Sequence, residues 1–142
     1  MLVHLLYASR AASPVTAATI DSILHQSLAR NPGIGITGVL CHAGDVFMQV
    51  LEGGRTQVNE LYNAIVRDPR HRQVMLLHYE ELPERRFGSW TMGHVRLDRI
   101  NPSLLLKYSE KPQLDPFAVS GQASLALLRE LVATAQIVGR AG

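Results

Sequence analysis

Hydrophobic and polar positions divide the chain into segments with two different periods. Strand-like segments, which alternate or run apolar, are residues 2–9, the two halves of 33–53, 72–82 and 90–97. Helix-like segments, in which apolar residues recur on one face, are residues 16–31 and 56–68. These two periods distinguish strands from helices. The predicted order of elements is therefore β-α-β-β-α-β-β.

Proline and glycine mark where these elements are expected to begin and end. Ser13-Pro14 is a typical helix start, because proline suits the first helical turn. Asn31-Pro32-Gly33 predicts the end of that helix, since proline disfavours α geometry in the residue before it. Ala43-Gly44-Asp45 predicts a turn between the second and third strands, and Asp68-Pro69 ends the second helix.

This order of elements is typical of an α+β fold of the ferredoxin-like type, a split β-α-β-β-α-β unit, here with an extra fifth strand. Two crossover helices cover only one face of a sheet, so C-terminal helices are expected on the other. Residues 101–110 predict a short helix and residues 120–138 a longer one. The apolar side of the longer helix consists of Leu125, Leu128, Leu131, Val132 and Ala135. We expect a domain over residues 1–97 and a helical extension over 98–142 that packs on the sheet.

The third strand carries one polar residue in an apolar setting. Alternation places Gln49 on the face that it shares with Phe47 and Leu51. The opposite face is also apolar, which predicts a central strand covered on both sides. A buried amide without partners costs on the order of 1–3 kcal/mol. Gln49 therefore needs hydrogen-bonding partners.

Two more polar residues interrupt apolar elements. Tyr7 lies on the first strand, which is expected to run next to the third strand and parallel to it. Asn31 ends the first helix on the stripe that faces the sheet, where the small Ser27 leaves space. Together with Gln49, these residues could converge between the sheet and the helices. Taken singly, Tyr7 is also explained as a core tyrosine and Asn31 as a helix stop. Gln49 is also explained as a core amide whose hydrogen bonds are satisfied.

Composition narrows the possible functions. The chain has 142 residues, 46% of them hydrophobic and 18% charged, which predicts one globular domain. The net charge is only +2 without a basic run, so nucleic acid is not an expected partner. No signal peptide or membrane-spanning run is evident. Cys41 is the only cysteine, which agrees with a reducing compartment, and we expect a cytoplasmic location without membrane contact.

Five motifs follow one another along the chain. They are LLYASRA (5–11), ARNPGIGITGVL (29–40), GDVFMQVLEG (44–53), DPRH (68–71) and ERRFGSWTMG (84–93). In residue type and spacing the set resembles the BLUF domains, which are blue-light sensors using FAD. The resemblance covers residues 2–97, the whole of such a photosensory domain. His42 departs from the pattern, because relatives often carry an aromatic residue there.

The resemblance implies a non-covalently bound FAD, with its ring between the two crossover helices and one edge toward the sheet. The implied contacts are Tyr7, Ile23, Ser27, Asn31, Gln49, Ile65, Asp68, Arg70 and His71. Asn31 is expected to bond the pyrimidine edge of the ring, and Arg70 a carbonyl on that side. The diphosphate and adenine are expected to be loosely held, in agreement with the lack of a P-loop motif.

The resemblance also implies a mechanism. Tyr7 is expected to give an electron and then a proton to the excited flavin. The Gln49 amide then rearranges and hydrogen-bonds the flavin C4 carbonyl, which shifts the spectrum to the red; a rotated amide and an imidic tautomer are both open. Trp90 and Met92, expected on one face of the fifth strand, are implied to compete for the place beside Gln49 and to transmit the change. Ordinary core packing is the alternative for each.

These expectations describe a photoreceptor rather than an enzyme. Its implied partners are a downstream signalling protein in trans and further copies of the chain in a homo-oligomer. A small ferredoxin-like flavin-dependent oxidoreductase or an acylphosphatase-like hydrolase is the alternative, but Ser/His/Asp order and metal-ligand spacing are absent. An RNA-binding domain would present aromatic and basic residues on its sheet, and residues 45–53 lack that pattern. A yellow colour and a reversible red shift would distinguish these readings.

Overall fold

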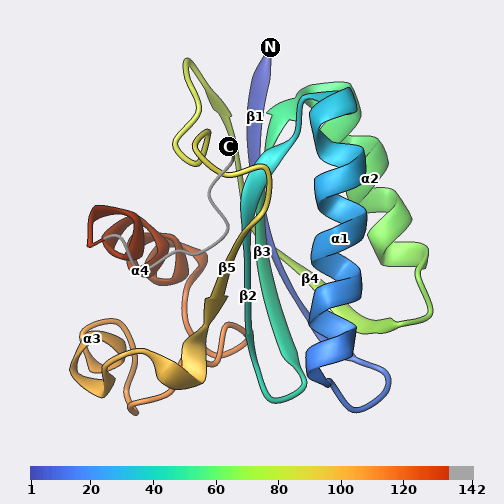
Figure 1. Ribbon diagram of the computed structural model, residues 1–142. Helices are drawn as coiled ribbons and strands as arrows, with labels where there is room; N and C mark the ends of the chain where they lie inside the picture. Colours follow the sequence, from blue (N-terminus) through green and yellow to red (C-terminus); the bar gives the residue numbers. More distant parts are fainter. Residues whose placement is uncertain (135–142) are drawn as a thin grey trace.

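The computed structural model describes residues 1–134 as a five-stranded sheet with helices on both faces (Figure 1). The strands are β1 (Leu2–Ala11), β2 (Thr37–Ala43), β3 (Val46–Gly54), β4 (His71–Leu82) and β5 (Gly93–Arg96). The helices are α1 (Ala17–Ile34), α2 (Arg55–Arg67), α3 (Pro102–Leu106) and α4 (Gly121–Ala133), with a short 3-10 turn at Leu97–Arg99. α1 and α2 cover one face, and α3 and α4 lie on the other, which confirms the predicted fold class. The part of the predicted last helix beyond residue 134, including Ala135, lies outside the described residues.

The strands are ordered β4-β1-β3-β2-β5. β1 is the neighbour of β3, as predicted, but the expectation that they run parallel is wrong: the two strands are antiparallel. The reason is the β2–β3 hairpin, which reverses the chain after the first crossover. The parallel partners within the described part of the sheet are β2 and β5. Tyr7 and Gln49 nevertheless lie directly opposite one another in the β1–β3 ladder.

β3 lies in the middle of the sheet and is buried on both faces, as the alternation predicted. Phe47 and Leu51 pack in the core under α1 and α2, which we call the helix-pair core. Met48 and Val50 pack in the core on the opposite face, the far-face core, which includes α4 leucines. This arrangement places Gln49 on the face of the sheet that α1 and α2 cover.

The first helix begins and ends later than the sequence signals indicate. It begins after Thr16 rather than at Ser13-Pro14, because the Thr16 hydroxyl caps it by accepting the Thr19 N–H at 3.2 Å. It continues through Pro32 and ends at Gly35, whose φ of 69° is the left-handed geometry that glycine adopts easily. The Asn31 carbonyl accepts the Gly35 N–H there, which closes the last turn despite the proline. Asn31 is thereby inside the helix.

The fifth strand is shorter than predicted, because residues 90–92 precede it as an irregular segment. Alternation does not apply outside a pleated strand, and the expected common face of Trp90 and Met92 is wrong. Trp90 packs in the far-face core, and Met92 packs in the helix-pair core. The Trp90 carbonyl accepts the Gly38 N–H at 3.0 Å, which ties this segment to β2.

A buried carboxylate with a histidine partner fastens the loop that leads to residues 90–92. Glu52 Oε1 accepts the backbone N–H groups of Arg86 at 2.8 Å and Phe87 at 2.7 Å. Glu52 Oε2 lies 3.1 Å from His4 Nδ1, and both side chains are buried in the far face. The loop therefore has a fixed attachment to β1 and β3. Within the described residues, no helix has the length and apolarity needed to cross a membrane.

Candidate functional site

A cavity of about 110 Å³ lies between α1, α2 and the sheet. Its walls come from β1, α1, β2, β3, α2 and the start of β4. The lining residues are Tyr7, Ile23, Gln26, Ser27, Arg30, Leu40, Phe47, Gln49, Leu61, Ala64, Ile65, Asp68, Arg70 and His71. The walls combine apolar side chains with a few polar groups, which suits a flat organic ring with a polar edge.

Gln49 is held at the floor of this cavity by two partners. The Tyr7 hydroxyl donates to Gln49 Oε1 at 2.5 Å. The Gln49 Nε2 group donates to Met92 Sδ at 3.3 Å. A primary amide has two N–H donors and a carbonyl with two lone pairs, so one N–H and one lone pair are available for a further partner. The need for partners that the sequence indicated is thus met in part, and the remaining capacity borders the cavity.

Tyr7 is almost completely buried, at 2% exposure. Burial raises the pKa of its phenol, the nearby Tyr62 adds to the rise, and the positive charge of Arg30 opposes it. The ring centroids of Tyr7 and Tyr62 are 5.7 Å apart. The Tyr7 phenol is therefore protonated throughout the ordinary pH range, and it holds its proton on the hydrogen bond to Gln49.

Asn31 lies at the end of the cavity rather than on its surface. Its side chain is fully buried, and its Nδ2 group donates to the Thr91 carbonyl at 3.0 Å. Its Oδ1 accepts from Arg30 Nε at 3.1 Å. Asn31 thus connects α1 to the segment that carries Met92. One N–H and one lone pair of this amide are also unused by protein groups.

Three residues form the rim near α2. Arg70 makes a bidentate pair with Asp68, with distances of 2.7–3.1 Å. This hydrogen bonding holds the pKa of Asp68 below its usual value. His71 Nδ1 is hydrogen-bonded to Ser9 Oγ at 2.9 Å, and burial lowers the pKa of His71. The Asp68 pair directs the Arg70 guanidinium, and the Ser9 contact orients the imidazole.

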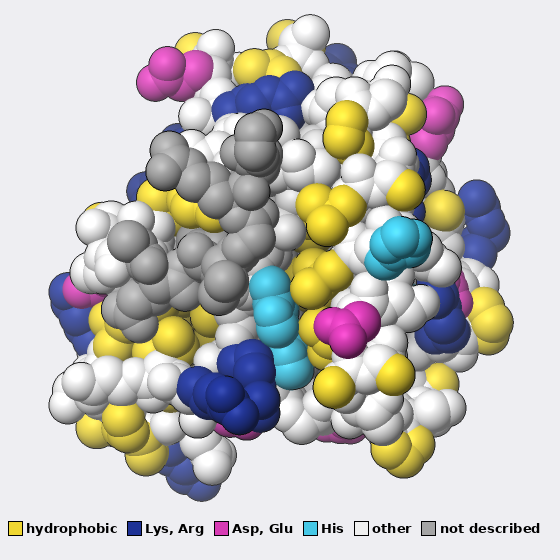
Figure 2. Space-filling view, in the orientation of Figure 1, with side chains coloured by type: hydrophobic (Ala, Val, Ile, Leu, Met, Phe, Trp, Pro, Cys, Tyr) yellow, Lys and Arg dark blue, Asp and Glu magenta, His cyan; other side chains and the backbone are white. Residues whose placement is uncertain are grey.

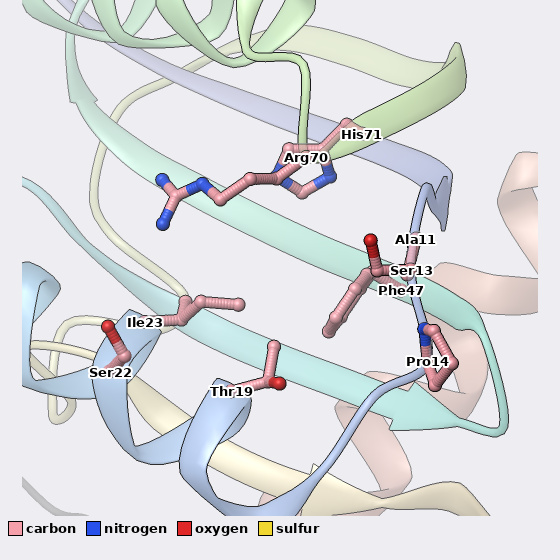
Figure 3. Close-up of a pocket in the computed structure, with 9 residues that line it drawn as sticks. All are labelled: Ala11, Ser13, Pro14, Thr19, Ser22, Ile23, Phe47, Arg70 and His71. Atoms are coloured by element: carbon pink, nitrogen blue, oxygen red, sulfur yellow. The ribbon is translucent and has the colours of Figure 1, made fainter.

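A second cavity of about 320 Å³ adjoins the first, because Ile23, Phe47, Arg70 and His71 line both. Figure 3 shows Thr19, Ser22 and Ile23 of α1 on one side of it and the two basic residues on the other. Ser13 and Pro14, in the connection before α1, close one end. We call this second cavity the outer cavity and the first one the inner cavity. The outer cavity is lined by apolar side chains together with hydroxyl groups and the nitrogen atoms of Arg70 and His71.

Most of the side chains selected from the sequence meet at this site. Those that line the inner cavity are Tyr7, Ile23, Ser27, Gln49, Ile65, Asp68, Arg70 and His71. Asn31 and Met92 touch the site through hydrogen bonds, whereas Trp90 lies on the far face.

Sequence reasoning missed several wall residues. They are Gln26, Arg30, Leu40, Phe47, Leu61 and Ala64. Helical spacing was a usable signal for some of them, because Gln26 and Arg30 follow Ile23 by three and seven residues and share its face. Leu61 precedes Ile65 by four residues, and Ala64 follows Leu61 by three, so the same kind of spacing links both Ile65 and Ala64 to Leu61. Phe47 shares the face of Gln49 by alternation.

Comparison with known proteins points to a single family. The model of the family of sensors of blue light using FAD (BLUF) matches residues 2–93. Photoactivated adenylate cyclase subunit beta of Euglena gracilis is 38% identical over 92 residues, which are 64% of this chain and 11% of that protein. The blue light- and temperature-regulated antirepressor BluF of Escherichia coli K12 is 36% identical over 88 residues, 62% of this chain and 22% of that protein. This chain thus spans only a small part of the length of these relatives.

Two solved structures match over nearly the whole chain. The dark-state structure of BlrB, a BLUF protein, has a TM-score of 0.79 and 32% identity, and the match covers 94% of this chain and 96% of that one. The photo-activated state of BlsA has a TM-score of 0.79 and 28% identity, covering 93% and 95%. The helices on the far face are thus included in both matches. By sequence and fold, this chain belongs to the BLUF family of flavin-using blue-light sensors.

Proposed function

We propose that this chain is a cytoplasmic blue-light receptor that binds FAD non-covalently and acts without catalytic turnover. The observation that carries the proposal is the short Tyr7–Gln49 hydrogen bond at the wall of a cavity between two helices. This bond joins a buried phenol to an amide that still has unused donor and acceptor capacity. Such a pair suits a photosensor that works by hydrogen-bond exchange, because it is stable in the dark and its donor and acceptor groups can exchange partners.

The residues present fit a flavin. The ring is assigned to the inner cavity, with Ile23, Ser27 and Ile65 against its faces. The unused N–H and lone pair of Asn31, together with Arg70, are assigned to its pyrimidine edge. Arg30, which the sequence reasoning left out, is assigned to the same edge because it lines the cavity and bonds Asn31. Asp68 and His71 are assigned to the rim, and the hydroxyl-lined outer cavity to the chain beyond the ring.

When bound, the flavin supplies absorption of blue light and, once excited, an acceptor for one electron. Tyr7 would supply that electron and then its phenolic proton, which in the dark lies on the 2.5 Å hydrogen bond to Gln49 Oε1. With the Tyr7 donor withdrawn, the Gln49 amide would be free to rearrange, either by exchanging its two ends or by forming the imidic tautomer. When Tyr7 regains its electron and proton, the new amide arrangement persists. The protein thus stores the event as a changed hydrogen-bond pattern.

The output is assigned to the segment beside Gln49. Met92 Sδ accepts from Gln49 Nε2, and the Thr91 carbonyl accepts from Asn31. Two of the site's amides therefore hold this segment, and Trp90 in the same segment contacts the far-face core. A change at Gln49 is expected to reach β5 and the C-terminal helices and, through them, a signalling partner in trans. The relatives named adenylate cyclases illustrate one kind of output to which such a domain is attached.

The first prediction concerns the spectrum. The purified protein is expected to be yellow and to show a small, reversible red shift of the flavin bands under blue light. Gln49→Leu is expected to retain flavin and to lose the red shift, because leucine fills the space without a donor or acceptor. Absorption spectra before and after illumination measure both, and mass spectrometry of the released cofactor distinguishes FAD from FMN.

Three results would count against the proposal. A normal shift in Gln49→Leu would remove Gln49 from the mechanism. A yellow protein without any shift that oxidises NADH would favour the flavin-dependent oxidoreductase. A protein that releases no flavin on denaturation would exclude both functions.

A further inference from the structure

The ladder between β1 and β4 is irregular at the position of the photoactive tyrosine. Leu6 pairs with His78 and Tyr7 pairs with Leu76, so Leu77 has no partner on β1. A bulge of this kind places one extra residue in a strand and leaves that residue outside the ladder. The β4 backbone beside Tyr7 therefore lies outside the regular ladder, and a second irregularity leaves Gln73 and Val74 without partners on β1 as well.

The first residue of α4 packs against this bulge, backbone to backbone. A Cβ atom added at Gly121 would lie 2.1 Å from the Leu77 carbonyl oxygen and 2.8 Å from its carbonyl carbon. No side chain fits between these two segments, so a glycine is required by the contact and not by its backbone angles. Displacement of the Leu77 peptide therefore presses directly on the start of α4.

The rest of α4 transmits such a displacement as a unit. Ser120 caps the helix by accepting the Ala123 N–H at 3.0 Å, which sets where the helix begins. Leu125, Leu128 and Leu131 anchor it in the far-face core. Within the described residues, α4 lies beside β4. A capped helix held along one face moves as a rigid element rather than bending at its end.

We infer that the contact between Gly121 and the Leu77 peptide is a coupling point through which a change at Tyr7 reaches α4. This inference rests on the proposed photoreceptor function and adds a route that does not pass through residues 90–92. In this route the loss and recovery of the Tyr7–Gln49 hydrogen bond moves the β1 backbone at Tyr7. The unpaired Leu77 peptide follows, and α4 shifts where it touches that peptide.

The test compares the flavin-loaded full chain in darkness and under blue light by hydrogen exchange. Gly121→Ala inserts a methyl group where only backbone contact exists. It is expected to keep the red shift and to lose most of the light-dependent exchange difference in residues 121–133. Gly33→Ala is the matched control, because a Cβ there meets nothing within 4 Å. It is expected to behave like the unsubstituted protein in both measurements.

A second pair of variants distinguishes the route through residues 90–92 from the route through Leu77 and Gly121. Met92→Ala and Trp90→Ala are expected to leave a light-dependent difference in residues 121–124. If they abolish it, the signal to α4 passes through residues 90–92 and the inference is overturned. Should Gly121→Ala fail to fold, the unsubstituted protein still decides: equal dark and light exchange at both 76–79 and 121–124 refutes the coupling. If the red shift is present but the exchange is equal in dark and light, only the coupling is refuted and the photoreceptor function is retained. If the red shift is absent, both the photoreceptor function and the coupling are refuted.

Discussion

At the scale of single residues, Gln49 illustrates why a polar side chain is retained in a core. Its burial would cost about 1–3 kcal/mol without partners. Tyr7 and Met92 provide two, from two different elements. The amide can therefore report a change at Tyr7 to the segment that carries Met92, which an apolar residue at the same position could not do.

Tyr7→Phe tests the donor at this scale. The variant is expected to bind flavin, to lose photoconversion and to show brighter flavin fluorescence, because the ring remains but the phenolic proton does not. Gln49 Oε1 loses its donor, so the free energy of unfolding is expected to fall by about 1–3 kcal/mol. Denaturant unfolding and the dark-minus-light spectrum measure these effects.

Tyr62→Phe is the matched control for this variant. It removes a hydroxyl from the ring that neighbours Tyr7 without breaking the bond to Gln49. It is expected to photoconvert normally. Wild-type photoconversion in Tyr7→Phe, lost in a double variant with Tyr62→Phe, would identify Tyr62 as the productive donor instead.

At the scale of elements, the parallel pairing of β2 and β5 brings two imidazoles together. His42 and His94 stack with ring centroids 4.9 Å apart and planes within 2°. Figure 2 shows adjacent histidine side chains next to a group of Lys and Arg side chains on the face seen there. Arg96 is a nearby cation, and Asp98 and Asp21 are nearby anions. His42 lies on β2, and His94 lies on β5, the short strand that follows Met92.

This stack predicts a loss of stability in mild acid. Burial, together with neighbouring positive charge, lowers the pKa of both histidines below 6.5. Between 6.5 and the lower folded values, the unfolded chain binds more protons than the folded one, so stability rises with pH. The contribution of the pair is complete above 6.5 and is lost as the pH falls through the folded pKa values.

Urea unfolding at about pH 7.5 and about pH 5.5 measures the effect as a change in unfolding free energy. His42→Phe is expected to reduce the difference between the two conditions, because it removes one titrating ring and preserves the stack. His25→Gln, on the exposed face of α1, is the control and is expected to leave the difference unchanged. An identical pH dependence in His42→Phe would show that the stack does not contribute.

At the scale of the whole molecule, β4 is an edge strand with apolar side chains in solvent. Met75, Leu76 and Tyr79 are each nearly half exposed. A long edge strand with apolar side chains is a site for pairing with another chain. We therefore expect the homo-oligomer to form through this edge, with a second copy as the neighbour.

Tyr79→Lys together with Leu76→Lys is expected to shift the protein toward monomer, because like charges would face one another across the edge. Light scattering after size exclusion at several protein concentrations measures the mass. Leu106→Lys, which alters an exposed leucine on α3, is the control. A monomer at every concentration in the unsubstituted protein would end the oligomer hypothesis, and an unchanged mass in the double variant would move the interface elsewhere.

The sequence by itself determined the elements and much of the site, because periodicity is a local property. Period two in residues 46–51 predicted both the central strand and the face of Gln49, and the structure confirms both. Helical spacing placed Ile23, Ser27 and Ile65 on faces that do line one cavity. The domain boundary at residue 97 stays a prediction, since the family model ends at residue 93.

The tertiary structure decided whatever depends on irregular backbone or on contacts between distant segments. Trp90 and Met92 lie on opposite faces because residues 90–92 are not a pleated strand, and no period predicts the direction of side chains there. The bulge at Leu77 and its contact with Gly121 are likewise invisible locally, because each forms only when elements far apart in the chain meet. Alternation assigns a residue to a face, but packing selects which distant backbone that face touches.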